Sequence, residues 1–328
     1  MDSTPAPAWW LYRGTGVPLS PDERDRRWPA APPWRAYSGG PDEPLPQAQD
    51  EAGTRILGAA DTPWASDPGE VLKVNTAILL RRPLLVGGAP GSGRSALAYR
   101  IARELGLGPV LRWRITGGST LRDGLYGPAG GGSVRLGPLG TALLPLRLPR
   151  VVLVDDLDRG GFDLPDDLLG VLEDGEFTIP ELLGPAGAAE TGPLVHTCDR
   201  GVTATVRDAV VRCHEPPLVV VTTSAEHDLS PAFVRHCVSL DPAPMSPERL
   251  AALAHARFPA LAGQEQDRLL DRLLELALRE PSSGHVTARL LDALHLVAGG
   301  ALGAGREGTE DGEAALDAVW RWVAVEEP

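Results

Sequence analysis

A short apolar run that breaks into glycines and then opens a helix constrains this chain more than any other stretch. It covers residues 84–97 and reads LLVGGAPGSGRSAL. Gly88, Gly93, Arg94 and Ser95 fall at the spacing of a phosphate-binding loop, with arginine in the place of the usual lysine. Glycines let successive backbone N–H groups approach a polyphosphate, and the N-terminus of the helix adds partial positive charge. The stretch therefore predicts a buried parallel strand, a nucleotide-binding loop and a helix.

This loop is the candidate site for ATP with Mg²⁺. The Ser95 hydroxyl is the expected metal ligand, because it can reach a Mg²⁺ that bridges the outer phosphates. The residues expected to bind the nucleotide are Gly88, Ala89, Pro90, Gly91, Ser92, Gly93, Arg94, Ser95 and Ala96. The alternative is a glycine-rich turn between strand and helix without a ligand. The pattern indicates binding more strongly than hydrolysis, because Arg94 departs from it.

A second decisive stretch, VVLVDD, covers residues 151–156. Four apolar residues that end in two acids are typical of a central parallel strand, and ligands lie at the carboxyl ends of such strands. We expect Asp155 to hold Mg²⁺ through water and Asp156 to orient and activate the attacking water. The alternative is a buried strand that ends in a solvated acidic turn.

Charge and hydropathy exclude several classes of function. The net charge of −13 and the pI near 5.0 argue against non-specific binding to nucleic acid or to an anionic membrane. Because no apolar run reaches about 18 residues, we expect no membrane span. The chain does not open with a signal peptide pattern, so we expect a cytoplasmic protein.

The three cysteines, Cys198, Cys213 and Cys237, each lie within two residues of a histidine. A Cys/His metal site is conceivable, but no C-x-x-C pair anchors one. Their odd number and wide spacing argue against a disulfide framework. We interpret them as small buried hydrophobic residues.

Three regions are expected. Residues 1–66 form a proline-rich N-terminal arm, residues 67–242 an α/β domain, and residues 243–328 a small helical lid domain. The arm has the composition of a flexible segment, yet it contains five of the eight tryptophans: Trp9, Trp10, Trp28, Trp34 and Trp64. We therefore predict an extended arm that tryptophans anchor, either to its own domain or to a neighbouring subunit.

Periodicity and capping residues give the expected elements. In the α/β domain, helices are expected at 71–80, 95–105 and 164–172, and buried strands at 110–115 and 218–224. Residues 175–179 and 203–212 are expected to form hairpin strands that flank a variable loop. In the lid, helices are expected at 248–258, 265–279, 286–297 and 313–325.

Together these features resemble an AAA+ ATPase, and the details are most similar to the MoxR branch of that family. The resemblance covers about residues 67–297. Its residues are the GPL turn at 137–139, the DDLDR pattern at 155–159 and the LGVLEDG helix end at 169–175. It implies an αβα sandwich with a parallel sheet and a helical lid. It also implies a homo-oligomeric ring, usually of six subunits, that remodels a client, often with a partner that contains a von Willebrand factor A domain.

The chain departs from the family pattern at several chemical positions. Arg94 replaces the loop lysine, Asp156 replaces the catalytic glutamate, and Ser224 occupies the position of the sensor asparagine. Arg235, one place before His236, is the candidate for the residue that a neighbouring subunit contributes. Arg289 is the candidate sensor arginine of the lid. The residues expected to act in catalysis are Asp155, Asp156, Ser224 and Arg235.

Two interpretations of the departures stay open. One is sequence drift, since Lys73 is the only lysine and aspartate can sometimes do the work of glutamate. The other is impaired hydrolysis, because arginine fits a phosphate cradle poorly and aspartate falls one methylene short. The second favours an ATPase with weak or partner-dependent turnover, or else a non-hydrolysing nucleotide-gated scaffold. A P-loop kinase or GTPase fits less well, because the chain has no N-K-x-D pattern and ends in helices.

Overall fold

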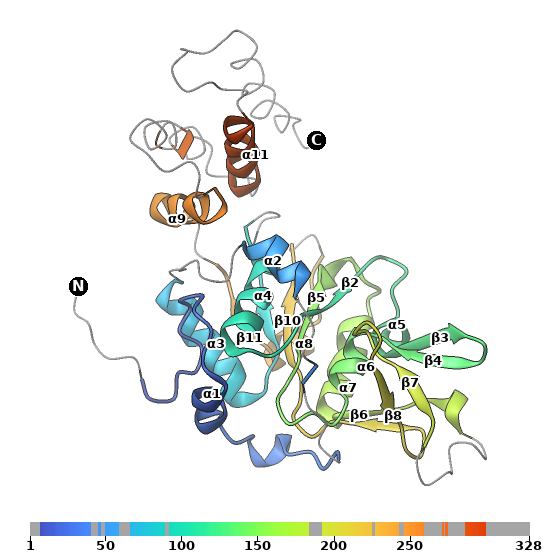
Figure 1. Ribbon diagram of the computed structural model, residues 1–328. Helices are drawn as coiled ribbons and strands as arrows, with labels where there is room; N and C mark the ends of the chain where they lie inside the picture. Colours follow the sequence, from blue (N-terminus) through green and yellow to red (C-terminus); the bar gives the residue numbers. More distant parts are fainter. Residues whose placement is uncertain are drawn as a thin grey trace. The chain divides into compact units, whose positions relative to one another are not determined.

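The computed structural model (Figure 1) describes residues 7–40, 45–46, 50–58, 66–88, 92–183, 192–224, 227–242, 246–258, 271, 273–274 and 286–299. The chain divides into two compact units. The first comprises residues 1–57, 66–88 and 94–242, and the second comprises residues 58–65, 89–93 and 243–328.

A five-stranded parallel sheet forms the centre of the first unit. Its strands lie in the order β11 (Val238–Leu240), β1 (Leu84–Val86), β10 (Leu218–Thr222), β5 (Val151–Asp155) and β2 (Leu111–Arg114). Every pair of neighbours is parallel. The carboxyl ends of all five strands therefore meet at one edge of the sheet, which is where an open α/β sheet binds its ligands.

Helices cover both faces of this sheet. Successive residues of β5 point to opposite sides, so that Val152 joins one hydrophobic cluster and Leu153 joins the other. On the side of Val152 lie α6 (Pro138–Ala142), α7 (Leu164–Asp174) and α8 (Pro231–His236); on the side of Leu153 lie α3 (Pro68–Leu80) and α4 (Arg94–Leu105). The α/β sandwich with a parallel sheet that the sequence predicts is confirmed.

The two helices beside β1 have clear start and stop signals. The Asp67 side chain caps α3 by accepting hydrogen bonds from the N–H groups of Gly69 and Glu70. Helix α4 is followed by Gly106 in the left-handed conformation, with φ at 59°, which confirms the expected C-cap. Helix α4 begins at Arg94, so Arg94 and Ser95 of the candidate phosphate-binding loop form its first turn.

Two smaller sheets lie outside the central one. A four-stranded sheet contains β3 (Tyr126–Gly130), β4 (Ser133–Leu136), β7 (Leu194–His196) and β8 (Thr203–Thr205); a two-stranded sheet contains β6 (Glu176–Thr178) and β9 (Val210–Arg212). The prediction of one strand over 203–212 is wrong, because this stretch contains two strands, β8 and β9. A turn with positive φ at Asp208 and Ala209 precedes β9, so β8 and β9 pair with different partners. Three short helical segments complete the first unit: α5 (Leu121–Leu125) precedes β3, η2 (Leu157–Arg159) follows β5 of the central sheet, and η3 (Pro180–Leu182) follows β6.

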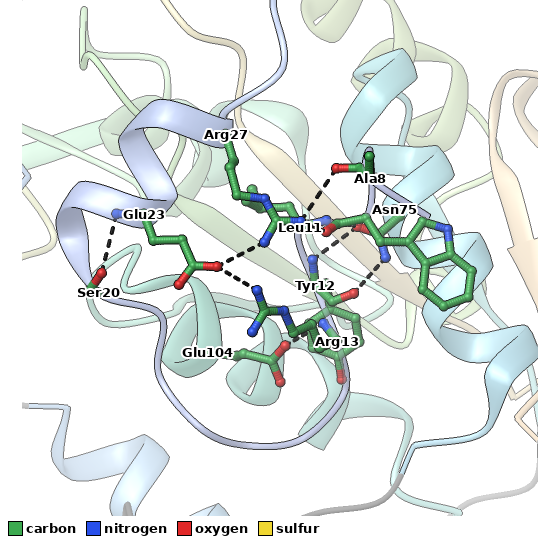
Figure 2. Close-up of polar contacts among 10 residues, drawn as sticks. Ala8, Leu11, Tyr12, Arg13, Ser20, Glu23, Arg27, Asn75 and Glu104 are labelled. Atoms are coloured by element: carbon green, nitrogen blue, oxygen red, sulfur yellow. Dashed lines mark hydrogen bonds and ion pairs between the residues drawn. The ribbon is translucent and has the colours of Figure 1, made fainter. Parts of the chain in front are cut away.

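The N-terminal arm is part of the first unit, and its residues 10–16 pack on the side of α3 and α4. Leu11 and Tyr12 are its most deeply buried residues, at 1% and 0% exposed. Asn75 of α3 binds the arm backbone at both residues, and Glu104 of α4 accepts a hydrogen bond from the N–H group of Arg13 (Figure 2). Glu104 also accepts from the N–H groups of residues 14–16. Short helical pieces follow in the arm: α1 (Pro21–Arg27), η1 (Pro33–Arg35) and α2 (Glu51–Leu57).

Tryptophans anchor this arm only in part. Trp10 and Trp28 pack against the cluster on the α3 side, and Trp28 also lies under the guanidinium of Arg81. In contrast, Trp9 is 43% exposed and Trp34 is 75% exposed. Trp64 lies outside the described residues. Leucine and tyrosine, rather than the largest rings, therefore occupy the buried positions.

The described part of the second unit is helical. It contains α9 (Pro247–Arg257) and α11 (Val286–Ala298). Ser246 caps α9 and Pro247 is its first residue, as expected. A small hydrophobic core joins these helices to Leu273 and Leu274. Most of the helix expected at 265–279, and all of that at 313–325, lie outside the described residues.

Candidate functional site

The candidate phosphate-binding loop connects β1 to α4. Gly88 and Gly93 have φ angles of 117° and 85°, a conformation that side chains with a Cβ rarely adopt. A Cβ added to Gly93 would meet no atom of the described residues within 4 Å. Ala89, Pro90 and Gly91 lie outside the described residues. The two glycines that define the spacing thus have the backbone that a phosphate loop needs.

Two side chains of the loop carry buried polar atoms without a partner. Among the described residues, neither Ser92 Oγ nor Arg94 Nη1 has a hydrogen-bond partner, although both atoms are buried. Leaving a buried polar group unpaired is costly, and in native sites an unmade bond often marks the place of a ligand. A phosphate oxygen is an acceptor for both groups, so the loop residues fit a nucleotide.

Asp155 ends β5 and lies beside the start of α4. Its Oδ1 accepts hydrogen bonds from Ser95 Oγ at 2.7 Å and from Thr222 Oγ1 at 3.1 Å. The structure therefore brings together Ser95 and Asp155, the two residues expected to hold Mg²⁺. Thr222, the last residue of β10, was not among the predicted site residues.

The second carboxylate oxygen of Asp155 binds an arginine. Arg112 of β2 donates to Asp155 Oδ2 through Nε at 3.0 Å and also through Nη2. Burial by itself raises the pKa of the Asp155 carboxyl, but the hydrogen bonds from Ser95 and Arg112 outweigh burial, so its pKa lies below the usual range. Asp155 is thus an anion whose two oxygens are already engaged.

Asp156 pairs with the arginine of the loop. Arg94 Nη2 lies 3.6 Å from Asp156 Oδ1, and the Arg94 side chain is only 7% exposed. Asp156 has left-handed backbone angles, with φ at 61° and ψ at 56°, a strained conformation for a residue with a side chain. Its N–H donates to Thr222 Oγ1 at 2.8 Å. Thr222 therefore fixes the carboxylate of Asp155 and the backbone of Asp156 at once.

The remaining predicted positions lie in different surroundings. Ser224 donates to Asp158 Oδ2 from its backbone N–H, at 3.1 Å, and from its hydroxyl, at 2.8 Å. Arg235 is an exposed residue of α8, and the neighbouring His236 Nδ1 lies 3.0 Å from Glu173 Oε1. Arg289 is a buried residue of α11 in the second unit. Ala96 follows Ser95 in the first turn of α4.

Sequence reasoning missed three side chains that complete the site: Arg112, Thr222 and Asp158. A signal for Arg112 was present, because an arginine alternates with Leu111 and Trp113 in a strand of the central sheet. Arg112 is 36% exposed, so burial does not require a partner for it, but the acids at the end of the adjacent strand β5 supply one of opposite charge.

Nothing in the described residues forms a metal centre of the Cys/His type. No group of three or more histidine, cysteine, aspartate or glutamate side chains could hold a metal ion there. All three cysteines are free thiols, and burial raises the pKa of Cys213 and of Cys237 to about 12. Among the residues that the structure describes, no helix is long and apolar enough to span a membrane.

Comparison with solved structures finds chains of similar fold at low sequence identity. A point mutant of RuvB from Thermotoga maritima is 15% identical, with 82% of this chain and 69% of that chain covered and a TM-score of 0.43. NtrX from Brucella abortus is 13% identical, with 79% of this chain and 56% of that chain covered and a TM-score of 0.46. NtrX in complex with ADP gives a TM-score of 0.44 at 13% identity, with 80% and 57% covered. The chain thus spans little more than half of NtrX.

No family model matches the sequence, and no curated protein matches it.

Proposed function

We propose that this chain is a nucleotide-binding ATPase of the AAA+ type. The observation that carries the proposal is the contact between Ser95 at the start of α4 and Asp155 at the end of β5. This contact places the hydroxyl of a phosphate-binding loop beside an acidic residue at the carboxyl edge of a parallel sheet. The unpartnered Arg94 Nη1 and Ser92 Oγ would donate to phosphate oxygens.

Slow hydrolysis is part of the proposal. Asp156 is the residue that would accept a proton from the attacking water. It is already paired with Arg94, and Thr222 and its own left-handed backbone hold it in place. Asp156 must break its ion pair with Arg94 before it can accept a proton, and its side chain is one methylene shorter than glutamate. It would therefore be positioned poorly to activate the attacking water. The same pairing favours the second candidate, a non-hydrolysing scaffold that a nucleotide stabilises.

The finer assignment rests on the resemblance of residues 67–297 to the MoxR branch. We propose a cytoplasmic ring subunit, with ATP between subunits and with Arg235 of one copy reaching the site of the next. A client protein and a partner with a von Willebrand factor A domain follow from the same resemblance. The net charge of −13 disfavours nucleic acid as a ligand.

At the expected Mg²⁺ site, the guanidinium of Arg112 already binds Asp155. Ser95 donates its proton to Asp155, which leaves its oxygen lone pairs for a metal ion. Asp155, however, would have to hold the ion with oxygens that already accept hydrogen bonds, Oδ1 from Ser95 and Oδ2 from Arg112. We therefore assign no step of the reaction to Mg²⁺.

Nucleotide binding by the phosphate loop is the test. Gly93→Val places a branched side chain in the loop and should abolish binding of a fluorescent ATP analogue. Gly201→Val is the matched control, because Gly201 also has a positive φ, of 74°, and a Cβ there likewise meets no atom of the described residues within 4 Å. Ser95→Ala, which leaves the backbone unchanged, should weaken binding about tenfold or more. If both loop variants bind like the parent, the site is misplaced.

A further inference from the structure

Each of the two adjacent acids in the site has an arginine of its own. Asp155 binds Arg112, and Asp156 lies beside Arg94. The two arginines come from different elements, since Arg112 belongs to β2 and Arg94 begins α4. The four side chains sum to a formal charge of zero. A loop with a single lysine and no second arginine would leave one negative charge.

The Arg112 contact is built into the sheet. Parallel pairing places Arg112 opposite Leu153 and Arg114 opposite Asp155, so that these arginines share the face on which Asp155 and α4 lie. Two nitrogens of Arg112 converge on one oxygen of Asp155, whose side chain is 5% exposed. A planar guanidinium with two donors binds a carboxylate more specifically than an ammonium does.

A divalent ion at a nucleotide site neutralises charge. It offsets the repulsion between the phosphates and nearby carboxylates, and its waters donate to the metal-binding acid. In this chain, arginine side chains can neutralise the charge and donate the hydrogen bonds. Arg112 donates two hydrogen bonds to Asp155 and cancels its charge, and Arg94 cancels the charge of Asp156. A polyphosphate that enters this site meets no net negative charge.

We propose that Arg112 takes the place of the divalent cation at Asp155, so that this chain holds a nucleoside di- or triphosphate with little dependence on Mg²⁺. The inference rests on the proposed nucleotide site. It adds a residue that determines which form of the ligand, free or metal-bound, the site accepts.

The experiment compares dissociation constants of a fluorescent ADP analogue in Mg²⁺ and in EDTA, with the full chain. For the parent, the two constants should agree within about threefold. For Arg112→Gln, binding in EDTA should be about tenfold or more weaker than in Mg²⁺, because the Asp155 carboxylate, no longer paired with a cation, then repels the phosphates unless a metal ion neutralises it. Arg112→Lys keeps the charge and should stay close to the parent ratio.

Arg114→Gln is the matched control. It removes the same charge from the same face of the same strand, and no hydrogen bond joins Arg114 to Asp155 among the contacts of the described residues. Its ratio of constants should equal that of the parent. An equal change in Arg114→Gln and Arg112→Gln would show a general charge effect and overturn the inference. Thermal unfolding of each variant reports whether β2 still folds.

Failure of the proposed role of Arg112 and failure of the proposed nucleotide site give different results. Loss of parent binding in EDTA, with tight binding in Mg²⁺, would overturn the role of Arg112 and leave the nucleotide site intact. Failure of the parent to bind in either buffer would overturn both. Binding in both buffers that only Arg112→Gln makes dependent on Mg²⁺ would establish the proposal.

Discussion

The side-chain amide of Asn75 pairs with the backbone of Tyr12 as a neighbouring strand would. Asn75 Oδ1 accepts from the Tyr12 N–H at 3.0 Å, and Asn75 Nδ2 donates to the Tyr12 carbonyl at 2.7 Å. The same oxygen accepts from the Leu11 N–H at 2.7 Å. Asn75 is 2% exposed and Tyr12 is fully buried. One side chain therefore satisfies three backbone groups of the arm that water cannot reach.

Replacing Asn75 should release the arm. Asn75→Ala leaves the buried backbone groups of Leu11 and Tyr12 without partners, and we expect a loss of about 2–4 kcal/mol in the free energy of unfolding. Limited proteolysis should then cut within residues 7–20 sooner than in the parent. Thr76→Ala is the control, because the Thr76 hydroxyl bonds only to Leu72 of its own helix among the contacts found. Equal protease resistance of all three chains would contradict the anchoring role.

Glu104 is the second anchor of the arm. Its carboxylate accepts four backbone N–H bonds, at 2.5–3.0 Å, although it lies near the negative end of the α4 dipole. Glu104→Gln replaces one acceptor with an amide that confronts N–H groups, so we expect a loss of about 2–3 kcal/mol in stability. Urea unfolding measures it. Glu51→Gln, at an exposed site in α2, should shift the midpoint little; if the two shifts match, the N–H cluster is not stabilising.

The Arg94–Asp156 pair makes a prediction about turnover. Asp156→Glu extends the carboxylate toward an attacking water, and Arg94→Lys weakens the hold on it. We expect each change to raise kcat, and the double variant to raise it on the order of 10- to 100-fold, with little change in nucleotide affinity. Steady-state phosphate release at matched oligomeric state measures this. A parent that already turns over rapidly, with neutral reversions, would support drift.

The ionised Asp155 carboxylate should make the stability of the folded chain depend on pH in the acid range. Because the pKa of its carboxyl is lowered in the folded chain, the unfolded chain binds that proton more readily. Its contribution to stability is complete above the ordinary pKa of about 4 and is lost as the pH falls through the lower folded pKa. Asp155→Asn should therefore flatten the fall in stability in this acid range. Unfolding midpoints of parent and variant from neutral pH downward test it; parallel curves would refute it.

Arg235 is predicted to act across a subunit boundary. It is exposed on α8, so Arg235→Ala should leave the fold intact and weaken association that ATP promotes. Sedimentation at several concentrations, with and without ATP, measures the association. Arg207→Ala, another exposed arginine of the first unit, serves as control. A chain that stays monomeric under every condition would contradict a homo-oligomeric ring.

The sequence predicted what local patterns encode. The glycine spacing around Gly88 and Gly93 fixes a strand, loop and helix because few other residues adopt those φ angles. The run that ends at Asp155 predicts a buried strand for the same local reason. The parallel sheet follows, since strands separated by helices must cross over.

Contacts between distant segments were harder to predict. Arg112 lies 43 residues before Asp155, and only the pairing of β2 with β5 brings them together. The arm was expected to dock by its tryptophans, because ring size suggests buried area. Burial instead follows the position of Asn75, whose three hydrogen bonds draw Leu11 and Tyr12 inward. Sequence alone does not show which backbone groups a buried amide will meet.

The arm contacts helices on both faces of the sheet, and this determines when it can fold. Tyr12 binds α3, whereas the Tyr37 hydroxyl donates to the carbonyls of Leu172 and Glu173 at the end of α7. Gly39 donates its N–H to the Cys213 carbonyl. During synthesis, upstream residues emerge from the ribosome before downstream ones, and contacts between residues far apart in the sequence form slowly. The arm precedes these partners in the chain, so the hydrogen bond of Gly39 can form only after synthesis has passed Cys213, later than the contacts of Tyr12 with α3.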